Sequence, residues 1–344
     1  MIRFFIFSSV FVAMLYGCAN SQQADTTFDR HNRAIHLLDN WMRDPYIILA
    51  PDDWYYLSCT RLSHIEGGKQ GIQVWRSRDL AKWENLGAIW TVEDSKWMHT
   101  LESVTREIKK DLKLWAPELH FLDGRWVAIH TTNIKRANLI VTQGPELKGP
   151  FYETIGEDFG RRHDPSIFTD NDGIHWLVWG CTKIAPLKPD FSGFAGPEIQ
   201  IGPSNRRMGH EGCVIRKIGD KYVLFGTAWS TDKMRHGTYN LYYCTADKVT
   251  GPYGPRKFAG RFLGHGTPFQ DRKGGWWCTA FLNGSYVTPE HVAEHGINPN
   301  RAETINKQGL TLVPLDVRIA DGDVQIRAKD PHYAEPGPEE AQDF

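Results

Sequence analysis

The sequence predicts an all-β fold, a five-bladed β-propeller, on three observations. A hairpin-like unit recurs five times, and each copy runs from an anchor residue to a tight turn and then into an aromatic and apolar segment. The anchors are Asp44, Trp115, Asp164, Glu211 and His265, in steps of 71, 49, 47 and 54 residues. Roughly 40 to 50 residues make one four-stranded blade. The 32 glycines, 19 prolines and 41% apolar content suit many short strands joined by tight turns.

The predicted elements follow one another along the chain. Each hairpin has its turn at a Gly or Asp signal, and the five hairpins occupy residues 44–59, 115–130, 164–179, 211–225 and 265–279. The long first step is explained by an insertion at residues 91–112, which is rich in Glu, Lys and Arg and predicts a helical excursion. A last hairpin at residues 310–327 ends the repeat.

The repeat predicts one domain despite the length of the chain. The propeller is expected over residues 38–333, with a lipoprotein-type signal peptide at 1–17, a polar tether at 18–37 and a disordered acidic tail at 334–344. Cys18 would be the lipidated first residue of the mature chain, and a plain secretory signal is the alternative. Either interpretation predicts export, with a bacterial cell-envelope lipoprotein favoured and contact with a membrane only through the lipid.

The net charge bears on the possible binding partners, and the cysteine content bears on the possible disulfides. A formal net charge of −1 provides no basic field for nucleic acid, so none is expected as a partner. Five cysteines remain after Cys18, an odd number, and four of them lie in or directly after apolar runs. Free buried thiols are therefore favoured over disulfides, although export permits either.

Six motifs carry a resemblance to a known family. They are Arg43-Asp44-Pro45-Tyr46-Ile47, Ser77-Arg78-Asp79-Leu80-Ala81-Lys82-Trp83, Trp115-Ala116-Pro117-Glu118-Leu119, His163-Asp164-Pro165-Ser166-Ile167-Phe168, Gly209-His210-Glu211-Gly212 and Gly264-His265-Gly266. With them, over about residues 38–333, the chain resembles glycoside hydrolase family 43, the five-bladed β-propeller inverting glycosidases. The resemblance implies that three carboxylates share the chemistry: Asp44 as general base, Glu211 as general acid, and Asp164 as the residue that orients the acid and tunes its pKa.

The physics of inversion agrees with these roles. One carboxylate must hold a water at the anomeric carbon while a protonated carboxyl group faces the leaving oxygen. Because a neighbouring negative charge disfavours ionisation, Asp164 is expected to keep Glu211 protonated near neutral pH. Each acid taken alone could be an ordinary strand or turn opener, and only its place in the repeat favours a catalytic role.

Three further residues are candidates for substrate binding. Trp115 could stack on a sugar or pack between blades, and Trp229 is a candidate of the same kind. The resemblance implies that His265 lies near the propeller axis, either beside a structural Ca²⁺ or hydrogen-bonded in the core; no cofactor is expected to be required. The His291-Val292-Ala293-Glu294-His295 run has zinc-ligand spacing, but a solvated surface helix is favoured.

The expected substrates are plant or algal oligosaccharides or polysaccharides that carry α-L-arabinofuranosyl, β-D-xylosyl or galactosyl residues, as the family resemblance implies. Residues 183–207 and 98–114 are the expected specificity loops. Two alternatives remain open: a related propeller hydrolase of the invertase-like type or of family 117, and a sugar-binding propeller without catalysis.

Overall fold

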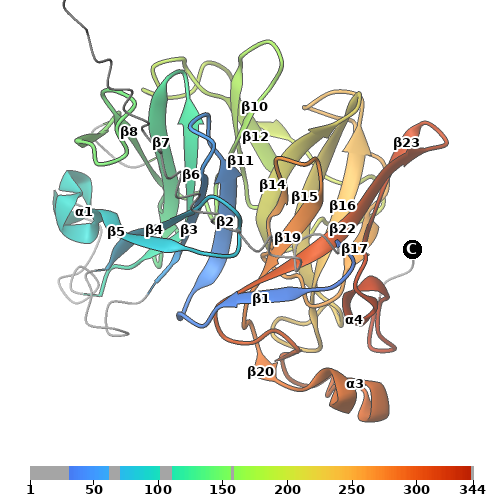
Figure 1. The fold of residues 1–344 in the computed structure, drawn as a ribbon. Coiled ribbons are helices and arrows are strands. Elements are labelled where there is room, and N and C mark those ends of the chain that lie inside the picture. The colour runs from blue at the N-terminus through green and yellow to red at the C-terminus, as the bar shows by residue number, and fades with distance from the viewer. Residues whose placement is uncertain (1–30, 62–69, 101–110, 156–158, 342–344) are drawn as a thin grey trace, which may run out of the picture. The chain divides into compact units, whose positions relative to one another are not determined.

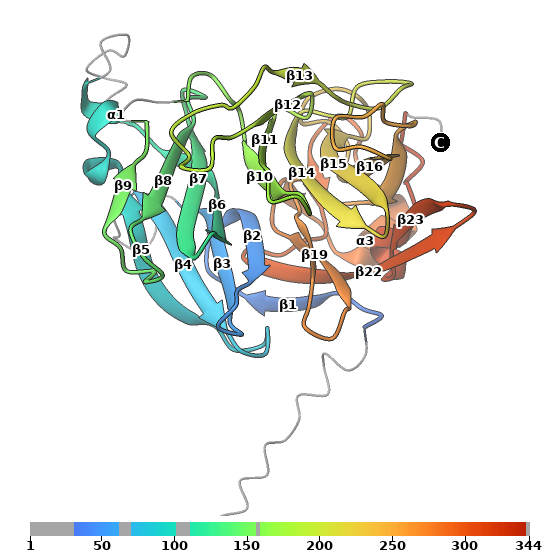
Figure 2. The ribbon, with the colours of Figure 1, turned by 90° about the horizontal axis from the view of Figure 1, so that it is seen from above.

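The computed structural model describes residues 31–61, 70–100, 111–155 and 159–341. The predicted signal peptide, Cys18 and most of the predicted tether lie outside these residues. Five antiparallel sheets surround a common centre, with the first strand of each sheet nearest to it (Figure 1, Figure 2), so the predicted five-bladed propeller is confirmed. No helix in the described ranges is long and apolar enough to cross a bilayer.

Each of the first four blades is a sheet of four consecutive strands. The strands are β2 (Arg43–Leu49), β3 (Tyr55–Thr60), β4 (Gly71–Ser77) and β5 (Glu84–Thr91) in blade I; β6 (Leu114–Leu122), β7 (Arg125–Thr132), β8 (Asn138–Thr142) and β9 (Phe151–Glu153) in blade II; β10 (Ser166–Thr169), β11 (His175–Trp179), β12 (Lys183–Pro186) and β13 (Ile199–Gln200) in blade III; and β14 (Glu211–Ile218), β15 (Lys221–Trp229), β16 (Tyr239–Ala246) and β17 (Lys257–Gly260) in blade IV.

Blade V joins the two ends of the described chain. Its inner strands are β18 (Pro268–Gln270), β19 (Trp276–Ala280) and β22 (Leu310–Ala320), and β22 is flanked by both β1 (Ile35–Leu38) and β23 (Asp323–Ala328). Because β1 pairs with the start of β22, the N-terminal strand closes the ring. The propeller therefore begins before residue 38, and the last residues of the predicted tether belong to blade V.

The remaining elements are short. They are η1 (Val92–Asp94), α1 (Lys96–Thr100), β20 (Ser285–Tyr286), α3 (Pro289–His295), β21 (Glu303–Thr304) and α4 (Pro331–Ala334). The first two are helical and lie in the predicted insertion, of which residues 101–110 are outside the described ranges. The histidine pair of zinc-ligand spacing lies on α3, whose residues are not buried, and its two rings stack at 4.9 Å. It forms a surface helix, as the sequence predicts.

The hydrophobic core lies between adjacent blades and not within any one of them. In β7, Trp126 and Ala128 pack toward blade I, whereas Val127 and Ile129 pack toward blade III. Successive side chains of a strand point to opposite faces of the sheet, and both faces of a propeller blade are covered. The central strands therefore read as continuous apolar runs, which is the pattern the repeat shows in the sequence.

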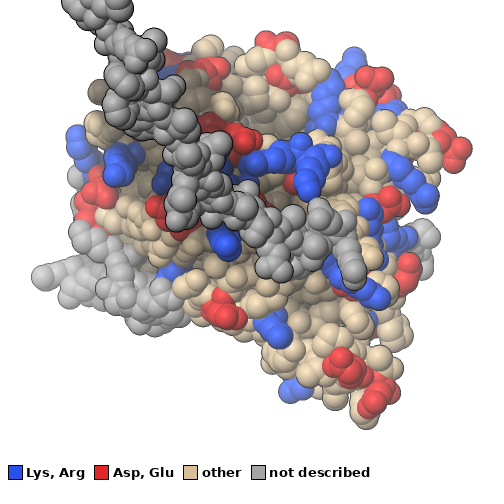
Figure 3. Space-filling model, viewed as in Figure 1, with Lys and Arg blue, Asp and Glu red and all other residues tan. Residues whose placement is uncertain are grey.

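The five described cysteines are buried free thiols, as predicted. Over the face of the molecule shown in Figure 3, basic and acidic side chains are interspersed, in keeping with the small net charge. Neither observation calls for a polyanionic partner.

The C-terminal segment differs from the disordered tail predicted for residues 334–344. Glu339 accepts hydrogen bonds from Arg261 at 2.6 and 3.0 Å and from Thr238 at 2.9 Å, and its side chain is only 4% exposed. Glu340 accepts hydrogen bonds from Tyr242 and Asn240. The acidic residues of this segment are therefore the partners of donors in blade IV, and the described part of the tail packs on the propeller.

This ion pair gives a prediction for stability. Glu339→Ala is expected to lower the free energy of unfolding by about 3–5 kcal/mol, because Arg261 would remain a buried cation without its partner. Denaturant unfolding followed by tryptophan fluorescence measures the loss. Glu335→Ala, at an exposed acid of the same segment, is the matched control and should change stability by less than about 0.5 kcal/mol. A loss for Glu339→Ala as small as that of the control would contradict the packed tail.

Candidate active site

The candidate active site is built at the point where the first strand of each blade begins. Each blade has a residue there with a left-handed backbone, namely Asp44, Ala116, Asp164, Gly212 and His265, with φ between 44° and 66°. This conformation is costly for residues other than glycine, and it concentrates at functional sites. In blades I, II and IV it coincides with a shift of strand register, as a β-bulge produces. In these three blades the bulge changes the direction of the side chains at the start of the strand.

The repeat predicted from the sequence is off by one residue in two blades. Trp115 and Glu211 do not share the left-handed position of Asp44 and Asp164; each is the residue before it, so Glu211 corresponds to His163. The side chains of Glu211 and His163 are 27% and 23% exposed, whereas those of Asp44, Asp164 and His265 are 6–10% exposed. The acids therefore lie in two layers, with Glu211 nearer to solvent.

A glycine is needed beside Glu211. Gly212 has φ of 66°, and a Cβ atom added to it would lie 2.7 Å from the His265 ring. Only glycine both adopts this backbone and allows the imidazole to approach so closely. Cys213 follows, and its Sγ accepts the Cys181 backbone N–H at 3.3 Å, which ties β14 to blade III.

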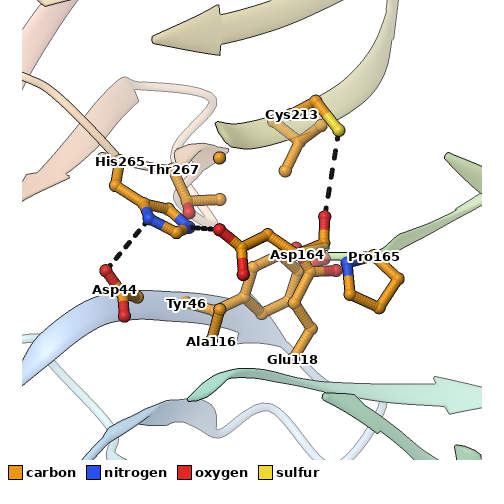
Figure 4. Close-up of a pocket in the computed structure, with 11 residues that line it drawn as sticks. Asp44, Tyr46, Ala116, Glu118, Asp164, Pro165, Cys213, His265 and Thr267 are labelled. Atoms are coloured by element: carbon orange, nitrogen blue, oxygen red, sulfur yellow. Dashed lines mark hydrogen bonds and ion pairs between the residues drawn. The ribbon is translucent and has the colours of Figure 1, made fainter. Parts of the chain in front are cut away.

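The three predicted carboxylates converge on His265, and Figure 4 shows two of them, Asp44 and Asp164, at its ring. His265 Nδ1 lies 3.0 Å from Asp44 Oδ1 and 4.0 Å from Glu211 Oε1, and Nε2 lies 3.9 Å from Asp164 Oδ2. Since 3.0 and 4.0 Å are measured from one nitrogen, the two carboxylate oxygens are no more than about 7 Å apart. One sugar ring could therefore contact both Asp44 and Glu211.

Other residues of the site were not singled out by sequence reasoning. His163 lies between two of the acids: its Nε2 is 3.0 Å from Glu211 Oε2, and its Nδ1 is 3.3 Å from Asp164 Oδ1. The Tyr239 hydroxyl donates to Glu211 Oε1 at 3.0 Å. The Thr60 hydroxyl donates to Asp44 Oδ2 at 2.8 Å and so fixes that carboxylate. His163 belongs to the His163–Phe168 motif named above. Tyr239 and Thr60 lie in strands where no acidic residue or histidine marks a site.

His265 carries a positive charge at the centre of the site. Burial alone would lower the pKa of His265, but Asp44, Asp164 and Glu211 together raise it to about 10, so the ring is an imidazolium at neutral pH. Burial would raise the pKa of Asp44, yet the charge and hydrogen bond of His265 hold it well below its usual range. Asp44 is therefore ionised, as a general base must be.

The other two acids differ from the sequence prediction. Burial, with the charges of Glu211 and Asp44, raises the pKa of Asp164 to about 6. Burial also acts to raise the pKa of Glu211, but the hydrogen bond from His163 and the charge of His265 lower it to about 2. In the protein without substrate, Asp164 therefore takes up a proton below a pH of about 6, whereas Glu211 stays ionised. The prediction considered the carboxylates alone and lacked the two histidines beside Glu211.

The two tryptophans predicted to bind substrate lie in different surroundings. Trp115 is partly buried and occupies the same layer as Glu211 and His163. Trp229 is 5% exposed, and its ring stacks on Tyr239 with centroids 4.4 Å apart and planes 14° apart. Trp229 therefore packs beneath the tyrosine that contacts Glu211, and that contact occupies one face of its ring.

The calcium site that the family resemblance implies can be tested against the residues present. Beneath the acids is a cavity of about 10 Å³, roughly the space of one water, lined by Tyr46, Glu118, Asp164, His265 and Thr267 among others. Ca²⁺ takes six to eight oxygen ligands. His265 offers only ring nitrogens, and its ring already lies 3.0 Å from Asp44 Oδ1 and 3.9 Å from Asp164 Oδ2, the kind of oxygens that such an ion would need. His265 therefore does not fit the role of a calcium ligand.

A five-bladed propeller that gathers three carboxylates and two histidines at its axis defines a protein suited to acid/base chemistry. Comparison with known protein families identifies the family to which this propeller belongs. Residues 37–309 match the model of glycosyl hydrolases family 43, and the chain belongs to that family. The resemblance seen in the sequence motifs is thereby confirmed, in preference to the invertase-like and family 117 alternatives.

Individual relatives are distant. The chain is 26% identical over 225 residues to a β-D-galactofuranosidase, xynD, of Aspergillus niger, covering 58% of this chain and 62% of the relative. It is 27% identical over 144 residues to a xylosidase/arabinosidase of Butyrivibrio fibrisolvens, covering 41% of this chain but only 25% of the relative. Among solved structures, the family 43 protein BlXynB of Bacillus licheniformis is similar, with a TM-score of 0.60 and 21% identity over 90% of this chain and 59% of that one.

Proposed function

We propose that the protein is a glycosidase that hydrolyses O-glycosyl bonds with inversion, using Asp44 as base and Glu211 as acid. The observation that carries the proposal is the convergence of an ionised Asp44 and of Glu211 on one imidazolium, close enough to flank a single sugar. Asp44 holds the attacking water, and Glu211 protonates the leaving oxygen. Asp164 supplies the proton and orients the acid through His163.

The proposed substrates are oligosaccharides or polysaccharides with α-L-arabinofuranosyl, β-D-xylosyl or galactosyl residues. In support, the matched relatives are described as a galactofuranosidase and a xylosidase/arabinosidase. A panel of aryl arabinofuranosides, xylosides and galactosides, incubated with the protein and with Asp44→Ala, tests the proposal. Equal turnover by the variant, or binding of sugars without any turnover, would exclude it, and the second result would indicate a sugar-binding propeller.

We also propose that the protein is exported and held at a bacterial envelope through lipid on Cys18. The support is a single early arginine, an apolar stretch and a cysteine at residues 3–18. No metal or other cofactor is proposed as a requirement. Radiolabelled palmitate incorporation, lost in Cys18→Ser, tests the anchor.

The pKa values give a prediction for pH dependence. The ratio kcat/KM is expected to fall as the pH rises through about 6, because Asp164 then loses the proton that the acid needs. His163→Gln removes a positive charge that lowers the pKa of both Asp164 and Glu211. We therefore expect this variant to lose roughly 10-fold in kcat and to shift the alkaline limb upward by about one pH unit.

Full pH–rate profiles of both proteins make the measurement. His291→Gln, on the exposed helix α3, is the matched control and should leave the profile unchanged. A lower kcat with an unmoved alkaline limb would reduce His163 to a packing role.

A further inference from the structure

A second cavity lies on the same face as the acids, between blades IV, V and I. Its volume is about 480 Å³, within the range of small-molecule sites. Its lining includes Trp41, Arg43, Arg235, Asn283, Arg301 and Gln308. They come from the entry to β2, the β15–β16 loop and the long β19–β22 connection.

Strand direction explains why these segments meet the acids. The first strand of a blade starts on the face where Asp44 lies, so the second strand ends there and the third begins there. Loops between second and third strands therefore border the site, as residues 230–238 and 281–309 do. The predicted specificity segment 183–207 includes the β12–β13 loop, which by the same rule lies at the opposite face. This is why sequence reasoning missed the cavity.

The cavity adjoins the catalytic residues directly. Arg43 precedes Asp44 in the chain, and the Asn283 amide donates to the carbonyl of Gly264, the residue before His265, at 3.2 Å. The backbone N–H of Gly237 donates to the Arg301 carbonyl at 3.0 Å, which joins the blade IV loop to the blade V connection. A sugar held between Asp44 and Glu211 would thus have its neighbouring unit beside these loops.

The charge of the cavity is positive. Arg301 forms an ion pair with Glu303, whose carboxylate is buried, so its charge is balanced. Arg43 lies over the Phe281 ring at 5.4 Å, and Arg235 is exposed. Among the described residues, neither of these two arginines has a carboxylate partner within ion-pair distance. The Arg235 guanidinium is therefore available to an anion, and Arg43, whose charge also acts on Asp44, is a second cation in the lining of the cavity.

The cavity also carries features that suit a sugar. Trp41 is partly buried and can present its ring to an apolar sugar face. Asn283 is only 3% exposed, and its Oδ1 has no donor among the described residues. A buried acceptor without a donor is costly, and a sugar hydroxyl would satisfy it.

We propose that this cavity is a subsite for a sugar unit that bears a carboxylate, a uronosyl residue next to the bond that is cleaved. The proposal rests on the proposed function and adds the class of substrate. A guanidinium matches a planar carboxylate with two parallel hydrogen bonds, which is the reason to prefer a uronate over other anions. The ring of the uronosyl unit lies along Trp41, and a hydroxyl meets Asn283.

The test measures binding apart from activity. Glucuronate and galacturonate are titrated into the full propeller by calorimetry, beside glucose and galactose as neutral sugars and galactose 6-sulfate as a second anion. Arg235 is the residue to change, because it is exposed and leaves no buried partner unpaired, unlike Arg301. Arg235→Gln is expected to weaken uronate binding by roughly 10-fold to 100-fold, and Arg318→Gln, an exposed arginine of β22 with only a 3.8 Å contact to Asp316, should not change it.

The outcomes separate the subsite from the activity. Tighter binding of a uronate than of its neutral counterpart, lost in Arg235→Gln, supports the proposal. Equal binding of both, or binding of the sulfate alone, overturns it. If neutral aryl glycosides are hydrolysed while uronates do not bind, the subsite fails and the proposed function stands. If uronates bind through Arg235 and no glycoside is hydrolysed, the subsite stands and the proposed function fails.

Discussion

Glu211→Gln is expected to lower kcat/KM toward oligosaccharides by roughly 10²-fold to 10⁴-fold, the usual contribution of a general acid. The amide keeps the size of the side chain and can still accept from Tyr239, so the fold should be unchanged. The loss arises because the leaving oxygen of a sugar is a poor leaving group unless it is protonated. Rates on an oligosaccharide and on a dinitrophenyl glycoside make the measurement.

The two substrates distinguish acid catalysis from damage to the site. A dinitrophenolate leaves without a proton, so the variant should retain most of its activity on that glycoside. Tyr239→Phe is the matched control, because it removes one hydrogen bond to Glu211 but leaves the carboxyl group. An equal loss on both substrates would contradict the assignment of Glu211 as the acid.

The fold could be predicted because propeller blades bury both faces. Val127 and Trp126 point to opposite neighbours yet are both apolar, so β7 reads as a continuous apolar run beside a Gly-rich turn. Few folds other than a five-bladed propeller accommodate five such runs. The C-terminal tail was mispredicted because its order depends on a contact that is distant in the sequence. Glu339 is acidic and follows Pro and Gly, and no neighbouring residue indicates that it forms an ion pair with Arg261.

The sequence indicated the carboxylates and the histidine that meet at the axis, but not the hydrogen-bond partners of the acids, the register of the site or its charge state. An acid followed by proline marked Asp44 and Asp164, but Glu211 precedes the glycine with the left-handed backbone and does not occupy the left-handed position itself. That offset places it in the outer layer, where His163 bonds to it. A pKa depends on all charges within a few ångströms. Those charges come from residues of other blades, whereas a sequence motif contains the residues of one blade only.

Asp44→Asn is expected to reduce kcat by roughly 10²-fold to 10⁴-fold on every substrate, including activated aryl glycosides. The base acts on the water, so a better leaving group cannot compensate for its loss. Asparagine can still accept from Thr60, and therefore the change removes charge more than shape. The rates of this variant and of Glu211→Gln on a dinitrophenyl glycoside should differ widely.

A second readout of the same variant is the titration of His265. Among the groups that raise the pKa of His265 to about 10, Asp44 contributes most, so the imidazolium of Asp44→Asn should lose its proton at a lower pH. NMR of the ring nitrogens follows this change. An unmoved pKa would show that Asp44 does not hold this charge in solution.

Inversion is tested with the alanine variant. Asp44→Ala leaves space where the water was held, and azide, which needs no base, should enter it and give a glycosyl azide of inverted configuration. For the unaltered protein, proton NMR of the first product should show the anomer opposite to the substrate. A retained anomer would mean that a carboxylate attacks the sugar itself, and the ionised Asp44 would then be the nucleophile in place of a base.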